Sequence, residues 1–159
     1  MSGKKTEKKT RVLFVDSAND LPSQIAEHYA QQMFGDRYEV YSAGPKKDIV
    51  DCDLISVMYC AGEDMRRQHS KKFDDTEALP KDGQYDYVIF LQKPVFAAWA
   101  TKTPWQGKQI LADMGTREEF KCTDEVELAQ CLTDMIDRVK AWISANMNDP
   151  AKLQALVTA

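Results

Sequence analysis

The stretch from Arg11 to Gly35 reads RVLFVDSANDLPSQIAEHYAQQMFG, and it decides the fold. Its first five residues, RVLFV, form a continuous run of β-branched, aliphatic and aromatic side chains, which is typical of a strand buried on both faces. From Ser23 the apolar residues recur at a helical period, and Gly35 stands where a helix is expected to end in a left-handed residue. Between them, Asp16 to Pro22 form a loop that joins the carboxyl end of a strand to the start of a helix.

Loops in this position bind anions in α/β proteins, because free backbone N–H groups and the positive end of the helix dipole point into them. The sequence therefore predicts an anion-binding loop. Its expected members are Asp16, Ser17, Ala18, Asn19, Asp20, Leu21 and Ser23.

The composition is that of an ordinary globular domain. The chain has 159 residues, of which 43% are hydrophobic and 29% charged, and its net charge is −4. We expect a disordered basic leader at 1–10, one domain at 11–147 and a C-terminal tail at 148–159. The leader carries four lysines and one glutamate, so the rest of the chain carries a charge of −7. Such an acidic body argues against nucleic acid as a partner.

The cysteines and the hydropathy indicate the compartment. No apolar run approaches the roughly 20 residues that a membrane span needs, so we expect no membrane contact. The cysteines show no CxxC pair and no histidine at zinc spacing; they are Cys52, Cys60, Cys122 and Cys131. We therefore expect a cytoplasmic protein with free thiols, no metal and no cofactor. A displaced redox pair of Cys122 and Cys131 is the alternative that the spacing leaves open.

The rest of the chain alternates strand and helix signals. Further strands are expected at 38–43, 85–91 and 108–112, and further helices at 54–61 and 123–146. This order predicts a parallel, doubly wound α/β sheet.

Two connecting segments carry distinctive side chains. The segment 63–72 is polar, and we expect its basic clusters Arg66–Arg67 and Lys71–Lys72 to form a solvated face, with a docking patch as the alternative. The segment 94–107 is expected to be irregular, with aromatic residues that cover one end of the sheet or form an interface. Neither His28 nor His69 is expected in a site.

Several segments together resemble the low-molecular-weight protein tyrosine phosphatase superfamily. They are LFVDSAN at 13–19, SQIAE at 23–27 and YEVYSAG at 38–44, and the similarity runs in matching order over residues 11–145. Within the superfamily the chain looks most like the thioredoxin-coupled arsenate reductases, with QHSK at 68–71 and YDYVI at 85–89 as further matches. The resemblance implies a three-layer α/β fold with a four-stranded parallel sheet and helices on both faces.

The signature loop of that superfamily is a cysteine, five residues, an arginine, and then serine or threonine. The cysteine thiolate is the nucleophile, and the arginine binds two oxygens of the oxyanion. Matched onto this sequence, Asp16 stands at the cysteine position and Pro22 at the arginine position. The loop asparagine, Asn19, and the following hydroxyl, Ser23, are kept.

Two further family positions also bear on activity. The resolving cysteine of the reductases corresponds to Gln92, and the acid of the family corresponds to Asp113, which lacks the usual following proline. Loss of a covalent nucleophile costs on the order of 10⁶ in turnover. A carboxylate at the mouth of an anion-binding loop repels phosphate, so we expect Asp16 to accept the N–H groups of the loop itself. We expect no catalysis from the degenerate positions Asp16, Pro22 and Asp113.

The sequence thus predicts a catalytically inactive relative of these enzymes that acts in protein interaction or regulation, with an unknown protein partner or as a homodimer. One alternative is an enzyme with relocated chemistry, in which Asp16, Asp20 or Asp113 bind a divalent cation. A second alternative is weak binding of phosphate or another oxyanion by the remaining loop amides. A response-regulator receiver is disfavoured, because FLQK at 90–93 lacks the phosphoacceptor aspartate expected after the third strand.

Overall fold

The computed structural model describes residues 9–158, and most of the expected leader at 1–10 lies outside these described residues. The elements follow in the order β1 (Thr10–Val15), α1 (Pro22–Phe34), β2 (Tyr38–Ala43), α2 (Cys52–Cys60), β3 (Gln84–Phe90), α3 (Lys93–Trp99), β4 (Gln106–Leu111), the 3₁₀ turn η1 (Arg117–Glu119), α4 (Glu125–Asn146) and α5 (Pro150–Leu156). The strands and the long helices begin and end within two residues of the positions expected from the sequence.

The four strands form one sheet, which is parallel as the sequence predicts, and their order in it is β2-β1-β3-β4. β1 pairs on one side with β2 and on the other with β3, so that Val12 lies opposite both Val40 and Tyr87. The chain winds outward from β1 to β2 and then crosses back to β3, so the winding direction reverses between β1 and β3. Open α/β sheets bind ligands in the crevice at such a switch point, outside the carboxyl ends of the strands.

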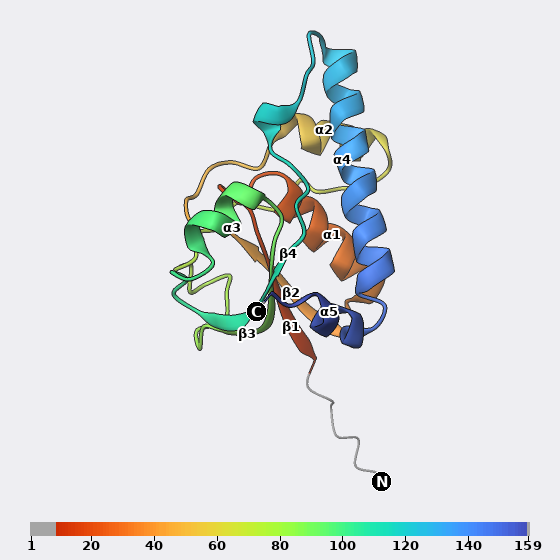
Figure 1. Ribbon diagram of the computed structural model, residues 1–159. Coiled ribbons are helices and arrows are strands. Elements are labelled where there is room, and N and C mark those ends of the chain that lie inside the picture. The colour runs from red at the N-terminus through yellow and green to blue at the C-terminus, as the bar shows by residue number, and fades with distance from the viewer. Residues whose placement is uncertain (1–8, 159) are drawn as a thin grey trace.

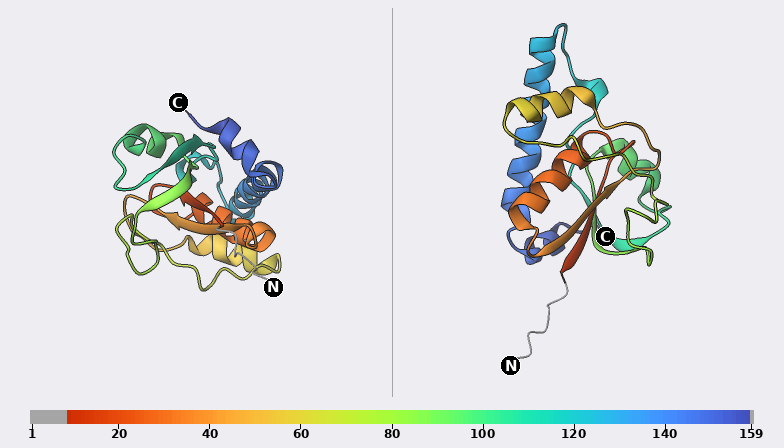
Figure 2. Two further views of the ribbon diagram at one scale, coloured as in Figure 1. Left: turned by 90° about the horizontal axis from the view of Figure 1, so that it is seen from below. Right: turned by 180° about the vertical axis from the view of Figure 1, so that it is seen from behind.

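Helices cover both faces of this sheet, which confirms the three-layer architecture. Side chains of β1 alternate between two cores. Val12 and Phe14 face the core formed with α1, α2, α4 and α5, whereas Leu13 and Val15 face the core that includes α3. Figure 1 shows α1 and α4 on one side of the sheet and α3 on the other, and Figure 2 shows the same layers from below and from behind. No helix within residues 9–158 is long and apolar enough to cross a membrane.

Aromatic side chains, three of them from the segment 94–107, pack in the core on the face of the sheet that α3 covers. The ring of Phe73 lies 4.8 Å from that of Trp105 and 5.5 Å from that of Trp99, and Phe96 lies 5.3 Å from Phe90. The expectation that this segment is irregular is wrong for its first part, which forms α3. Pro94 lies in the first turn of this helix, where proline is tolerated because that N–H has no intrahelical partner.

The two glycines that follow α1 and α2 differ in backbone conformation. Gly62 follows α2 with a φ of +87°, the left-handed conformation expected of a helix end. Gly35 follows α1 with a φ of −62°, so the left-handed end predicted there is wrong. The chain instead makes a further right-handed turn into β2, in which Arg37 N donates to Phe34 O at 2.9 Å.

The last residues do not form a tail outside the domain, which corrects the expectation for 148–159. Asp149 accepts a hydrogen bond from Ala151 N at 3.0 Å and caps α5, and Leu153 is fully buried in the core. Thr158 N then donates to Gln109 O on β4 at 2.8 Å. The Asp-Pro pair at 149–150, which predicts the end of α4, is therefore also the start of the next helix.

Candidate functional site

Asp16 organises the loop between β1 and α1. It is the first residue after β1, and its side chain is fully buried. One carboxylate oxygen, Oδ2, accepts hydrogen bonds from Ser23 N at 2.9 Å, Ser23 Oγ at 2.8 Å and Leu21 N at 3.3 Å. The other oxygen, Oδ1, accepts one from Asp20 N at 3.3 Å. The prediction that Asp16 accepts the N–H groups of the loop is confirmed.

Asn19 links the loop to its surroundings. Its φ of +50° is left-handed, a conformation that asparagine tolerates better than most residues. The side-chain Nδ2 donates to Ser23 Oγ at 2.8 Å, and Oδ1 accepts from Gln24 Nε2 at 3.0 Å and from Lys71 N at 2.9 Å. The loop is thus fixed from both sides by hydrogen bonds that a ligand would have to share or break.

The segment after α2 supports the loop from outside, which the sequence did not indicate. Ser70 Oγ donates to Ala18 O at 2.6 Å, and His69 O accepts from Gln24 Nε2 at 3.0 Å. Ser70 and Lys71 are both buried, so the expectation of an exposed face at 63–72 is wrong for these residues. This burial was not predicted because both residues are polar, and the groups that Ser70 Oγ and the backbone N of Lys71 bond to lie about 50 residues earlier in the chain.

Gly44, at the end of β2, lies directly against the loop. A Cβ atom at this position would lie 2.6 Å from Asp16 O and 2.8 Å from Asn19 N. Both atoms belong to the backbone and cannot rotate away. Only glycine therefore allows β2 and the loop to approach this closely.

Gln92 closes the loop at the switch point between β1 and β3. Its side chain is buried, its Oε1 accepts from Ser17 N at 3.0 Å, and its Nε2 donates to Gly115 O at 3.2 Å. The sequence drew attention to Gln92 only as the place of a missing cysteine. Its position two residues after the end of β3, at the carboxyl edge of the sheet, is the signal that could have indicated a contact with the loop.

Asp20 is the unusual acid of this site. Burial and the nearby carboxylates of Asp16, Asp48 and Asp51 raise the pKa of Asp20 to about 7. Its backbone oxygen accepts from Asp51 N at 2.9 Å, which ties the loop to the start of α2.

Arg117 is a second residue that sequence reasoning missed. Its guanidinium, from η1, forms an ion pair with Asp51, and its Nη2 lies 3.1 Å from Asp53 Oδ2. Asp51 also caps α2, because it accepts from Asp53 N at 3.0 Å and from Leu54 N at 3.1 Å. More than 60 residues separate the partners, so no local pattern could predict the contact.

Asp113 does not join the loop. It is exposed, and its Oδ1 accepts from Lys93 N at 3.3 Å and from Gly115 N at 3.1 Å, at the start of α3. Within residues 9–158 no group of three or more histidines, cysteines, aspartates or glutamates is placed to bind a metal ion. The structure thus does not bring Asp16, Asp20 and Asp113 together as a metal site.

The histidine and cysteine side chains lie outside the loop. His28 Nε2 lies 3.4 Å from Glu63 Oε1 at the boundary of the core, and His69 is exposed. The cysteines are all free thiols; Cys52 and Cys60 are exposed, and Cys122 and Cys131 are partly exposed.

The hydrogen bonds of the loop between β1 and α1 favour a structural role for it, in which it joins the strand to the helix, over an open anion-binding site. The backbone N–H groups of Ser17, Asp20, Leu21 and Ser23 all donate to side chains of the same chain, and Pro22 has no N–H to offer. A shallow pocket of about 380 Å³ lies beside Ser17; it is lined by Ser17, Pro45, Lys46, Pro94, Val95, Ala98 and Trp99. Its walls are mostly apolar, which suits a side chain better than a free oxyanion.

Comparison with known proteins gives structural neighbours and no sequence match. No protein-family model matches the chain, and no curated protein sequence matches it either. The tyrosine phosphatase Wzb of Escherichia coli K30, solved in complex with sulphate, aligns with a TM-score of 0.64 at 15% identity over 87% of this chain and 99% of its own. Vibrio vulnificus Wzb, solved in complex with benzylphosphonate, aligns with a TM-score of 0.63 at 18% identity, with the same coverage of both chains.

An arsenate reductase is also among the neighbours. The thioredoxin-dependent arsenate reductase of Corynebacterium glutamicum aligns with a TM-score of 0.58 at 18% identity over 91% of this chain and 65% of its own. The resemblance noted in the sequence is thereby confirmed for the fold. This chain has the three-layer, four-stranded parallel α/β fold of the low-molecular-weight tyrosine phosphatases and arsenate reductases.

Proposed function

We propose that the chain is a catalytically inactive protein of the low-molecular-weight phosphatase and arsenate reductase type, which acts in protein interaction or regulation. The observation that carries this proposal is the buried carboxylate of Asp16, which accepts four hydrogen bonds from its own loop. Oxyanion chemistry requires such donors to point at the substrate, and a carboxylate among them repels an anion.

The proposal further takes Asp16 and Pro22 as replacements for a nucleophilic cysteine and an oxyanion-binding arginine. Pro22 is the first residue of α1, where its ring suits the helix start but offers no charge to an anion. Arg117 could not take over this role without releasing the carboxylates of Asp51 and Asp53. Without a thiolate and a free guanidinium, neither a phosphocysteine nor an arsenocysteine intermediate forms at this loop.

A protein with this fold but without the chemistry can still bind other proteins through its surface. We propose that it binds a protein partner or a second copy of the chain. The four free cysteines support a cytoplasmic location. The oxyanion-sensing alternative is less well supported, because the loop N–H groups of Ser17, Asp20, Leu21 and Ser23 already donate within the protein.

Turnover assays test the proposal directly. Hydrolysis of p-nitrophenyl phosphate and thioredoxin-coupled reduction of arsenate should stay at the no-protein background, with and without Mg²⁺. Asp16→Cys should stay at background as well, because Pro22 still occupies the position of the missing guanidinium. A phosphatase with an intact cysteine and arginine loop serves as the positive control.

Two further variants separate true inactivity from relocated chemistry. Turnover that depends on a divalent cation and disappears in Asp16→Asn would overturn the proposal in favour of a carboxylate enzyme. Turnover that disappears in Cys52→Ser would assign it to the exposed thiol that begins α2.

Isothermal titration with inorganic phosphate should give no heat of binding up to about 10 mM. Binding that is lost when Ser23 is changed to proline would instead support an oxyanion sensor.

A further inference from the structure

The outer side of α2 carries no charged side chain along its middle. Cys52, Ser56 and Cys60 follow one another at intervals of four residues, so they lie along one side of the helix, and all three are exposed. We call these three residues the outer strip. Leu54 and Met58, on the opposite side of α2, are fully buried. Figure 2 shows α2 at the outside of the molecule, in front of α4 in the view from behind.

Apolar side chains and a hollow adjoin the outer strip. Tyr59, in the last turn of α2, is 55% exposed, and Ile49, three residues before the helix, is 69% exposed. They are two of the four large apolar side chains that are exposed within residues 9–158, so this side of the molecule gains most from being covered. A hollow of about 320 Å³ lies here; it is lined by Ile55, Ser56, Tyr59, Cys60 and Arg66.

The charged side chains beside the strip are paired within the chain. Asp53 Oδ2 lies 3.1 Å from Arg117 Nη2. Arg66 Nη2 lies 2.8 Å from Asp64 Oδ2, and the same guanidinium lies 4.6 Å from the centre of the Tyr59 ring. These pairs leave the strip itself without a charge that would select a charged partner or repel a second copy.

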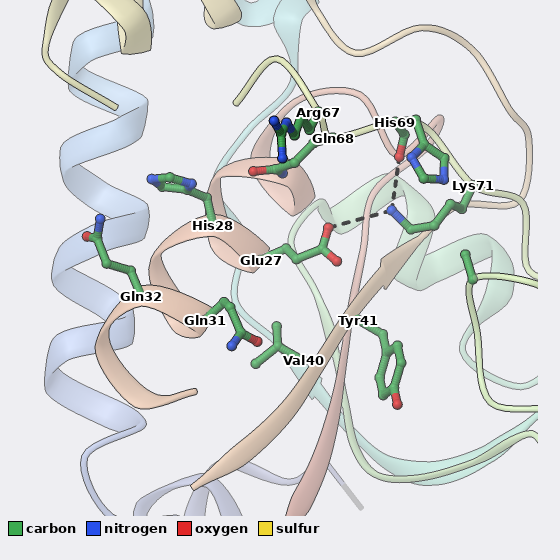
Figure 3. Close-up of a pocket in the computed structure, with 11 residues that line it drawn as sticks. Glu27, His28, Gln31, Gln32, Val40, Tyr41, Arg67, Gln68, His69 and Lys71 are labelled. Carbon is green, nitrogen blue, oxygen red and sulfur yellow. Dashed lines mark hydrogen bonds and ion pairs between the residues drawn. The ribbon is translucent and has the colours of Figure 1, made fainter. Parts of the chain in front are cut away.

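A pocket of about 540 Å³ between α1, β2 and the segment 67–78 is different, because its buried charges are already satisfied. Lys71 Nζ donates to His69 O at 2.9 Å and lies 3.5 Å from Glu27 Oε1, as Figure 3 shows. The same glutamate oxygen also accepts from Ser42 Oγ at 2.8 Å. A bound group would have to compete with these partners, so the pocket points to no ligand, and the outer strip of α2 is the better candidate for a contact.

The spacing of the outer strip makes it complementary to itself. Cys52 and Cys60 lie four residues on either side of Ser56, which is about 6 Å along the helix axis in each direction. If two antiparallel copies of α2 meet about a twofold axis at Ser56, Cys52 of each copy lies level with Cys60 of the other. The hollow, which belongs to the C-terminal half of α2, then faces the first turn of α2 in the second copy.

We propose that the chain forms an antiparallel dimer through α2, with Ser56 at the twofold axis and the hollow of each copy covered by the first turn of α2 of the other. This inference rests on the proposed role in protein interaction, since it names a second copy of the chain as the partner. Its failure is nevertheless separate. A monomeric chain would overturn the dimer and leave the inactivity standing, whereas turnover would overturn the inactivity and leave the dimer standing.

Sedimentation velocity of the full chain at rising concentration tests the dimer. The side of one short helix gives a small interface, so we expect a weak dimer with a Kd of about 10–100 μM. Ser56→Arg places two like charges at the axis and should weaken the dimer at least about tenfold. Ser144→Arg, the same change at an exposed position of α4, is the matched control and should leave the Kd within about twofold. Circular dichroism shows whether both variants are folded.

Thiol cross-linking identifies the residues in contact. The background carries Cys122→Ser and Cys131→Ser, so that only the thiols of α2 react. Within one copy these two thiols lie about 12 Å apart along the helix, beyond the reach of a short bismaleimide. The background chain should give a covalent dimer. Addition of Cys52→Ser or of Cys60→Ser should abolish it, and an equal mixture of these two variants should restore it, because only antiparallel pairing brings Cys52 of one copy beside Cys60 of the other.

The proposal is overturned by a chain that stays monomeric up to about 500 μM, or by equal dimer formation in Ser56→Arg and Ser144→Arg. Cross-linking of either single-cysteine variant on its own would also overturn it, because like thiols would then lie together, as in a parallel pair. A dimer whose mixed variants fail to cross-link has its interface elsewhere and counts against the proposal as well.

Discussion

The Oδ2 atom of Asp16 lies 2.8 Å from the hydroxyl oxygen of Ser23, and the backbone N–H of Ser23 donates to the same Oδ2 at 2.9 Å. Ser23 lies in the first turn of α1, and Leu21, at the N-cap position of this helix, has no side chain that could accept its N–H groups. Asp16 therefore performs the capping from a distance, and its negative charge lies at the positive end of the helix dipole. The carboxylate joins the end of β1 to the start of α1.

Replacement of this carboxylate should destabilise the protein. Asp16→Ala would leave buried N–H groups of Leu21 and Ser23 without their acceptor, so we expect the free energy of unfolding to fall by about 2–4 kcal/mol. Urea unfolding followed by circular dichroism measures the change. Asp74→Ala, at an exposed aspartate, is the control and should change stability by less than about 0.5 kcal/mol. Equal midpoints for the two variants would contradict a structural role of Asp16.

Asp20 should make stability depend on pH in an unusual direction. Its pKa is about 7 in the folded protein, well above the roughly 4 of an exposed aspartate. Between these values the folded state binds more protons than the unfolded state, so the free energy of unfolding falls as the pH rises from about 4 to 7. Because Asp20 is partly exposed, we expect a loss on the order of 1–2 kcal/mol, which urea unfolding at pH 5.5 and pH 8 would measure.

The variant Asp20→Asn identifies the residue responsible. It should remove most of the difference between pH 5.5 and pH 8 and should be more stable than the wild type at pH 8, because an amide carries no charge next to Asp16, Asp48 and Asp51. Asp74→Asn should keep the wild-type dependence. An unchanged pH profile in Asp20→Asn would show that another group titrates.

The close approach of Gly44 to the loop gives a third prediction. Gly44→Ala forces a Cβ to within 2.6 Å of Asp16 O, so we expect a loss of about 2–4 kcal/mol in the free energy of unfolding. Gly62→Ala is the matched control, because it meets open space and strains only its own backbone at a φ of +87°, which costs about 1 kcal/mol. The order of the two effects, measured by thermal unfolding, is the critical result, and a larger effect at Gly62 would refute the steric argument.

The packing of α5 gives a fourth prediction. Leu153 is fully buried, so Leu153→Ala should lower the free energy of unfolding by about 2–4 kcal/mol through the cavity it creates. Leu156, in the same helix, is 40% exposed, and Leu156→Ala should cost less than about 1 kcal/mol. Chemical denaturation of both variants decides whether α5 belongs to the core, and similar small effects would mean that it does not.

The positions of the strands, the long helices and the loop along the chain all follow from sequence periodicity. The RVLFV run of β1 and the spaced apolar residues of α4 bury enough apolar surface for their patterns to be clear. The prediction that the Asp16 carboxylate accepts the N–H groups of its own loop likewise followed from the charge of its side chain alone. A carboxylate that occupies these donors leaves none for a bound anion.

Contacts between distant polar residues could not be predicted in the same way. The hydrogen bonds from Ser70 to Ala18 and from Ser17 to Gln92 span 52 and 75 residues, and nothing in the polar side chains of Ser70 and Gln92 indicates that they are buried. Their burial depends on partners supplied by other elements. The short helix α5 escaped prediction for another reason, since its seven residues are too few to show a periodic pattern.

The hydrogen bonds of Asp16 also bear on how such a loop could change over generations. A single substitution that placed a thiol at residue 16 would remove the acceptor for Ser23, Leu21 and Asp20 while Pro22 still offered no positive charge. The intermediate would lose stability before any reactivity appeared. Selection on folding alone therefore favours the carboxylate, and sulfur chemistry at this loop would need several substitutions at once.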